Sequence, residues 1–145
     1  MAATTTVKEA RTGFFDTVRD FVDAWNRHDL DALGGFYSDA IVSERSGRKL
    51  EGKDSIKRDR ERLLSAFPDL AMDYRHQFSV GTHGVIEWRL RGTHKGVFET
   101  SAGGFAPTGK CVAWNGVSIW EMDESGLVIR ERVYADTAGL LQQLK

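Results

Sequence analysis

Two neighbouring stretches decide the fold: LAMDYRHQFSV (residues 70–80) and VIEWRLRGTHK (residues 85–95), separated by GTHG (residues 81–84). In the second stretch apolar Ile86, Trp88 and Leu90 alternate with charged residues, and a period of two is typical of a half-buried β-strand. The short glycine-containing link is typical of a tight turn between antiparallel strands. The two stretches therefore predict a β-hairpin whose inner face runs from Ile86 to His94.

The residues on either side extend this hairpin into a larger domain. Further strands are predicted downstream, and helices with one short strand upstream, at the following residues: strands 110–121 and 127–134, a final helix 137–144, helices 14–28, 30–37 and 54–67, and a strand 40–44. We expect Asp29 to cap the second helix and Asp54 or Ser55 to cap the third. Helices followed by a meandering sheet predict an α+β fold, in which a curved antiparallel sheet forms a cone covered by the N-terminal helices. Such a cone leaves a pocket, which the glycine-rich link 96–109 would rim.

Length and composition fit one ordinary globular domain over residues 1–145, with residues 1–12 as a loose lead-in. Twenty basic against twenty-one acidic residues leave a net charge of −1, which predicts no nucleic-acid or membrane partner. Cys111 is the single cysteine and the four histidines lack metal-ligand spacing, so we expect no metal and a cytoplasmic location. The run KRDRER (residues 57–62) is interpreted as a solvated helix face.

Strand alternation and aromatic content select candidate pocket residues. Trp25, Trp88 and Trp120 are expected to supply apolar walls, and Tyr37 and Asn115 are further candidates for substrate contact. The last strand has two possible inner faces, and alternation alone leaves both open. One face carries Arg132, Tyr134 and Asp136, and the other carries Ile129, Val133 and Ala135. Residues 113–120 are apolar on both sides, which predicts a homodimer through the outer face of the sheet.

Several short segments, in this order, resemble the SnoaL-like polyketide cyclase family. They are WNRHDLDAL (25–33), FPDL (67–70), GTHKG (92–96), PTGK (107–110), ERVYAD (131–136) and LLQQL (140–144). The resemblance implies a fold like that of nuclear transport factor 2 and an aldol-type ring closure without metal or cofactor. It also implies that Asp136 is the catalytic acid/base and that His94 and Arg132 line the pocket. Many cyclases have an aromatic residue where Arg132 stands, so this chain departs from the family pattern there.

An aldol cyclisation of a hydrophobic carbonyl compound needs a base and then an acid, and one carboxylate can serve as both. Burial in an apolar cone would raise the pKa of Asp136 towards neutrality. The alternative for Asp136 is a purely structural role as the N-cap of the last helix. Two alternatives to the cyclase also remain: an epoxide-hydrolase-like enzyme that uses Arg132 with Asp136, and a non-catalytic module that binds a small molecule.

Overall fold

The computed structural model describes residues 13–145. The helices are α2 (Phe14–Asn26), α3 (Leu30–Gly34), α4 (Lys53–Ala66) and α5 (Thr137–Gln143). The strands are β1 (Tyr37–Arg45), β2 (Arg48–Glu51), β3 (Ala71–Val80), β4 (His83–Thr93), β5 (Phe98–Thr100), β6 (Gly103–Phe105), β7 (Cys111–Met122) and β8 (Val128–Ala135). None of the helices within residues 13–145 is long and apolar enough to cross a membrane.

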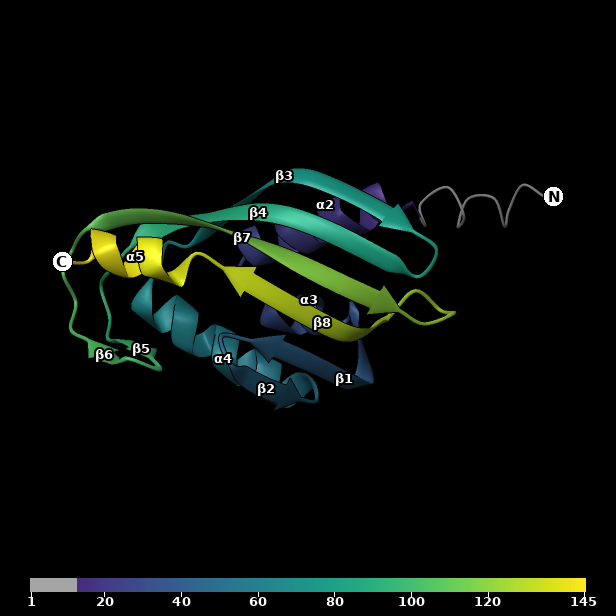
Figure 1. Cartoon of the computed structure of the whole chain (residues 1–145), viewed down its shortest axis with the longest axis horizontal. Coiled ribbons are helices and arrows are strands. Elements are labelled where there is room, and N and C mark those ends of the chain that lie inside the picture. The colour runs from purple at the N-terminus through teal and green to yellow at the C-terminus, as the bar shows by residue number, and fades with distance from the viewer. Residues whose placement is uncertain (1–12) are drawn as a thin grey trace.

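Six strands form one curved sheet in the order β2-β1-β8-β7-β4-β3, and β5 and β6 form a separate hairpin (Figure 1). Neighbouring strands are antiparallel except β1 and β8, which pair in parallel with Ser43 opposite Glu131. Helices α2, α3 and α4 lie against one face of this sheet (Figure 1). The predicted α+β class is therefore confirmed, with a sheet that is mixed because of this one parallel pair.

The alternation read from the sequence determines which side chains enter the core. On β4, Ile86, Trp88 and Leu90 are buried, whereas the charged residues between them are more exposed. Helix α2 buries Val18, Phe21, Val22, Ala24 and Trp25 against the same face. The carboxamide of Asn26 ties the end of α2 to β3, because it donates to the carbonyl of Met72 at 3.0 Å and accepts from the amide of Met72 at 2.7 Å.

Several local predictions need correction. The second helix ends at Gly34 instead of residue 37, and β1 begins at Tyr37. Asp29 caps α3 as expected, through the amide of Ala32 at 3.0 Å. Helix α4 begins after Gly52 without a side-chain cap, so the capping role expected of Asp54 or Ser55 was wrong. The expected lead-in of residues 1–12 lies outside the described residues.

Candidate functional site

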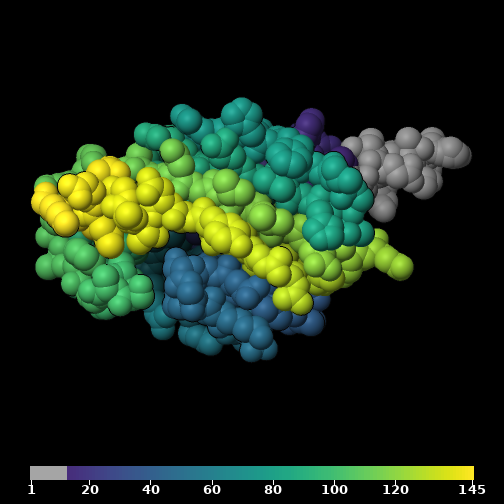
Figure 2. All heavy atoms as spheres, in the orientation of Figure 1, coloured from purple at the N-terminus to yellow at the C-terminus, as the bar shows by residue number. Residues whose placement is uncertain are grey.

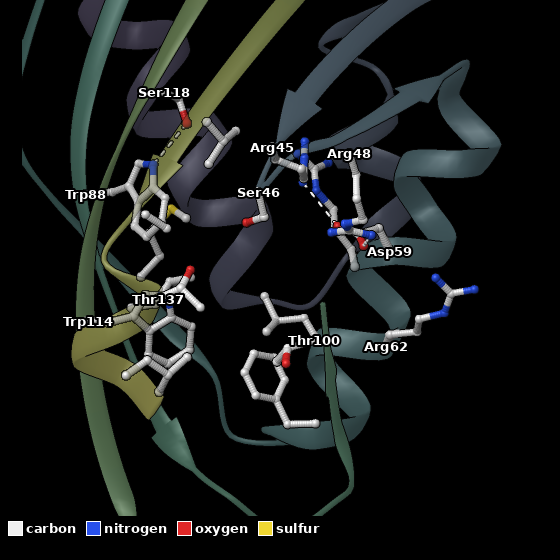
Figure 3. A pocket seen from close by; sticks show the side chains of 18 of the residues that line it. Arg45, Ser46, Arg48, Asp59, Arg62, Trp88, Thr100, Trp114, Ser118 and Thr137 are labelled. Carbon is white, nitrogen blue, oxygen red and sulfur yellow. Dashed lines mark hydrogen bonds and ion pairs between the residues drawn. The ribbon is translucent and has the colours of Figure 1, made fainter. Parts of the chain in front are cut away.

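A cavity of about 390 Å³ lies between the concave face of the sheet and α4. The surface is hollowed where α5, the β5–β6 hairpin and the β1–β2 hairpin come together (Figure 2). Residues 98–101 of the β5–β6 hairpin line the cavity, in agreement with the rim position predicted for the link 96–109. The cavity has an apolar wall on the sheet and a polar group of side chains opposite it (Figure 3).

Tryptophan side chains form much of the apolar wall. Trp88 and Trp114 project from β4 and β7 on one side of the cavity (Figure 3). The indole N–H of Trp88 donates to the hydroxyl of Ser118 at 2.9 Å, which fixes the orientation of the ring. The ring lies over Gly116, where an added Cβ would stand 2.3 Å from two of its carbon atoms. Glycine is therefore required at this position to let Trp88 lie flat on the sheet.

The polar side of the cavity is built around Arg45, at the end of β1. Its Nη1 donates to Oδ2 of Asp59 at 3.4 Å, and its Nη2 donates to Glu131 and to the hydroxyl of Ser43. Asp59, on α4, also accepts from Nη1 of Arg48 at 2.8 Å. The Arg45 guanidinium is thus held between two carboxylates and faces the apolar wall (Figure 3).

Glu131 anchors this group from the floor of the cavity, where its side chain is 2% exposed. The carboxylate accepts hydrogen bonds from Ser43 at 3.0 Å, Tyr37 at 3.0 Å and Trp120 at 2.8 Å, besides that from Arg45. Strand pairing explains this convergence, because Ser43 and Trp120 lie opposite Glu131 on the two neighbouring strands. All acceptor positions of a carboxylate are then occupied.

The electrostatics of this floor follow from burial and from the nearby guanidinium groups. Burial alone would raise the pKa of Glu131, but the charges of Arg45 and Arg60 and the hydrogen bonds outweigh it, so the pKa lies below its ordinary value. Burial raises the pKa of Tyr37 far above its ordinary value, although Arg60 opposes this. Glu131 is consequently an ionised anchor and Tyr37 a neutral donor.

The structure divides the predicted pocket residues into two groups. Trp25 and Trp88 line the cavity as predicted. Tyr37 and Trp120 are buried beneath it and bind Glu131, so they support the site from behind. Asn115 lies on the opposite face of β7, where its side chain accepts a hydrogen bond from Arg89 at 3.4 Å and its carbonyl accepts from the amide of Asp136 at 2.9 Å.

The last strand presents the other of its two possible faces to the cavity. Glu131, Val133 and Ala135 point inward, whereas Arg132 and Tyr134 point outward. Arg132 is exposed and pairs with Glu44 at 3.2 Å. Tyr134 is 61% exposed. Pocket positions for Arg132 and Tyr134 were therefore wrong, because strand parity places them on the outer face of the sheet.

Asp136 is exposed, and its carboxylate accepts from the amide of Gly139 at 2.9 Å as the N-cap of α5. Its two chain neighbours, Ala135 and Thr137, line the cavity, but Asp136 does not. Asp136 therefore lacks the burial that would raise its pKa, which the sequence analysis expected of a catalytic acid/base. Its observed contacts are those of a helix N-cap.

His94 is buried directly after the last residue of β4, outside the residues that line the cavity. Its Nδ1 interacts with both the hydroxyl and the amide of Thr108, at 3.1 and 3.2 Å. Its ring packs against Phe67 with 5.4 Å between the ring centroids. These contacts hold the start of the 96–109 link to the body of the domain, so His94 lies apart from the polar group around Arg45.

The sequence analysis missed the wall residue Trp114 and the charged groups of the polar side: Arg45, Arg48, Asp59, Arg60 and Glu131. The run at 57–62 was interpreted as a solvated face, but Arg60 is buried and Asp59 faces the cavity. One sequence signal pointed towards Glu131, namely that it shares strand parity with the apolar pair Val133 and Ala135. A carboxylate in phase with apolar residues is a candidate for burial.

The arrangement offers a hydrophobic surface next to a fixed guanidinium and a partly exposed carboxylate, Asp59. These groups can stabilise negative charge on a substrate oxygen and move a proton near it. Across residues 13–145, no group of three or more histidine, cysteine, aspartate or glutamate side chains is arranged to hold a metal ion.

Comparisons with known proteins agree on the type of domain. The family model described as SnoaL-like polyketide cyclase matches residues 15–144. Comparison with curated proteins gives no match. Among solved structures, AclR from Streptomyces galilaeus, provisionally described as a hydroxylase, is similar at 25% identity and a TM-score of 0.76, covering 88% of this chain and 91% of its own.

Two further structures show the same fold. IdmH from Streptomyces antibioticus, provisionally described as a polyketide cyclase, has 19% identity and a TM-score of 0.74, with 89% of this chain and 96% of IdmH covered. A protein from Catenulispora acidiphila with a ketosteroid isomerase-like fold has 16% identity and a TM-score of 0.72, with 87% and 89% covered.

Proposed function

Because this chain belongs to the SnoaL-like polyketide cyclase family, we propose that it is an acid/base enzyme that acts on a hydrophobic carbonyl compound held in the cavity. The reaction is an intramolecular aldol-type cyclisation or a related isomerisation, carried out without a metal or cofactor. The observation that carries the proposal is the position of the Arg45 guanidinium, fixed by Asp59 and Glu131 and facing a wall that contains Trp88 and Trp114.

Arg45 is proposed to stabilise the negative charge that develops on the substrate oxygen. Removal of a proton from the carbon next to a carbonyl moves an electron pair towards the carbonyl oxygen, and a preorganised donor lowers the energy of that state. The hydrogen bonds and ion pairs of Arg45 to Ser43, Asp59 and Glu131 keep its position fixed before substrate arrives. The apolar wall would hold the carbon skeleton and exclude water from the reacting carbon.

Asp59 is the carboxylate best placed to move the proton. Glu131 has its acceptor positions filled, whereas Asp59 lines the cavity and is 17% exposed. In the proposed cycle Asp59 removes the proton, the resulting enolate attacks a second carbonyl carbon of the same molecule, and Asp59 returns the proton to the new alkoxide. The product has the same composition as the substrate, so no co-reactant is required.

Matched variants separate Asp59 from Asp136, the acid/base residue that the family resemblance implies. The assay is the incorporation of deuterium from D₂O into 2-tetralone, a bicyclic ketone, followed by NMR. We expect Asp59→Asn to slow exchange by a factor of about 10²–10⁴, the range of a lost general base. Asp136→Asn should exchange at a rate close to that of the wild type and keep its melting temperature, since asparagine caps helices as well as aspartate. Normal exchange in Asp59→Asn with loss in Asp136→Asn would assign the chemistry to Asp136.

Epoxide hydrolysis is a second candidate, favoured by one specific observation. An arginine held between two carboxylates can orient a water molecule while a neighbouring acid protonates the epoxide oxygen, and Arg45 lies between Asp59 and Glu131. Incubation of styrene oxide in ¹⁸O-water distinguishes the two reactions, because a hydrolase incorporates the label in a diol and a cyclase does not. A ligand that binds without chemical change would instead indicate a binding module.

The cytoplasmic location remains a prediction from the cysteine content.

A further inference from the structure

Arg60 is a buried cation beside the cavity that the proposed cycle does not use. It lies on α4 next to Asp59, is only 4% exposed and contributes to the cavity lining. Its guanidinium carbon lies 5.0 Å from the ring centre of Tyr37, 5.1 Å from that of Trp25 and 5.6 Å from that of Phe21. Aromatic faces attract a guanidinium, but they do not neutralise its charge.

The hydrogen bonding of Arg60 is incomplete. Its Nη2 donates to the hydroxyl of Tyr37, and its buried Nε has no partner. None of the ion pairs within residues 13–145 includes Arg60, although Arg45 and Arg48 on the polar side each contact a carboxylate. Tyr37 stands between Arg60 and Glu131, since its hydroxyl accepts from Arg60 and donates to Oε2 of Glu131.

The nearby carboxylates are already engaged by other arginines. Glu131 contacts Arg45 directly, and Asp59 is shared between Arg45 and Arg48. The guanidinium groups of Arg45, Arg48 and Arg60 therefore lie around two carboxylates, those of Asp59 and Glu131. A buried charge without a paired opposite charge is costly, and such groups in proteins are normally compensated by a partner.

We propose that Arg60 is an anion-binding residue of the cavity and that the ligand carries an anionic oxygen, a carboxylate or phenolate, on a planar hydrophobic framework. The anion would complete the charge pairing of Arg60, and the planar framework would lie against the tryptophan wall. This inference rests on the proposed function, because it assigns the class of ligand that the same cavity accepts. Arginine suits this role because it remains charged and presents several N–H donors in one plane.

Isothermal titration calorimetry with matched bicyclic probes tests the inference. The probes are 2-naphthoate, its neutral analogue 2-naphthamide, and 2-naphthol titrated across its ionisation. We expect the wild type to bind naphthoate at least about tenfold more tightly than naphthamide, since charge-assisted hydrogen bonds are about twice as strong as neutral ones. A gain in naphthol affinity on ionisation would identify phenolate as the accepted oxygen, and no gain would restrict the site to carboxylates.

Arg60→Met removes the charge while it keeps an apolar side chain between the aromatic rings. It should lose the preference for naphthoate and bind naphthamide as the wild type does. Arg58→Met, on the exposed face of the same helix, is the matched control and should keep the preference. The wild-type comparison needs no variant, so equal binding of naphthoate and naphthamide overturns the inference even if Arg60→Met does not fold.

The outcomes distinguish this inference from the proposed function. Equal binding of naphthoate and naphthamide by the wild type would overturn the role of Arg60 and leave the hydrophobic cavity intact. An unchanged preference in folded Arg60→Met would do the same. Failure of all three probes to bind would overturn both the inference and the proposal of a cavity for hydrophobic ligands.

Discussion

The buried carboxylate of Glu131, on β8, connects this strand to β1 and β7 through hydrogen bonds at the floor of the cavity. Arg45 and Arg60 both lie near it, and Tyr37 and Trp120 hydrogen-bond to it. Replacement by glutamine keeps the shape of the side chain but removes the negative charge that pairs with Arg45 and lies near Arg60. Loss of one member of a buried charge pair costs about 3–5 kcal/mol.

We therefore expect Glu131→Gln to lower the free energy of unfolding by about 3–5 kcal/mol, measured by urea denaturation at pH 7. Glu44→Gln is the matched control, because Glu44 pairs with Arg132 on the exposed face of the same two strands. The control should change stability by less than about 1 kcal/mol. A similar decrease in the free energy of unfolding in both variants would show that burial does not make the Glu131 ion pair more important for stability than the exposed one.

The acid sensitivity of the fold should also depend on Glu131. The pKa of Glu131 in the folded state lies below the ordinary value of 4.5. The stabilisation that its ionised form gives to the fold is therefore fully present above that pH. As the pH falls further, the unfolded chain takes up the proton first and stability declines. Urea midpoints between pH 7 and pH 3 should fall more steeply for the wild type than for Glu131→Gln. Parallel curves would contradict the lowered pKa.

Single residues were harder to place from the sequence than the strands that carry them. Both faces of β8 contain charged residues, so the phase of Glu131 with Val133 and Ala135 was the one local sign that Glu131 and not Arg132 points inward. The answer depends on β1, which pairs with β8 and brings Ser43 and Arg45 to Glu131. The connection between these strands spans most of the chain, and local patterns contain no information about it.

Among the elements, the β5–β6 hairpin is held against the end of α4 by a close backbone contact. The amides of Lys95 and Gly96 both donate to the carbonyl of Ala66, at 2.9 and 3.2 Å. A Cβ at Gly96 would lie 2.2 Å from the carbonyl oxygen of Ser65. The helix end and the hairpin can approach this closely only because residue 96 has no side chain.

Gly96→Ala should therefore separate the hairpin from α4 and lower the free energy of unfolding by about 1–3 kcal/mol, the usual cost of overpacking. Hydrogen exchange measured by mass spectrometry should show faster exchange over residues 95–105. Gly34→Ala, in α3, is the control, because a Cβ added at that position would meet no atom within 4 Å. Unchanged exchange in Gly96→Ala would mean that the contact does not hold the hairpin.

Most elements followed from periodicity alone. The four long strands and the helices over residues 14–26 and 137–143 lie within about three residues of their predicted bounds, because each has a regular apolar face. Strand β2 and the β5–β6 hairpin were not predicted as strands. Both are short and polar or glycine-rich, and tertiary contacts decide the conformation of such segments.

For the whole molecule, the homodimer remains a prediction, and the outer face of the sheet is its expected interface. Tyr134 is 61% exposed there, next to half-buried Val117 on the neighbouring strand. We expect light scattering to give twice the chain mass for the wild type and the monomer mass for Tyr134→Glu. Phe15→Glu, an equally exposed aromatic position on α2, should leave the mass unchanged. A monomeric wild type would end this prediction.

The parallel pairing of β1 with β8 has a consequence for synthesis on the ribosome. Tyr37 and Ser43 donate hydrogen bonds to Glu131, which lies 94 and 88 residues later in the chain, respectively. Contacts this distant in sequence form late, since the intervening segment must first be closed into a loop. The apolar faces of the N-terminal helices therefore remain exposed to solvent until almost the entire polypeptide has left the exit tunnel. Nascent chains stalled before residue 131 should depend on chaperones to stay in solution.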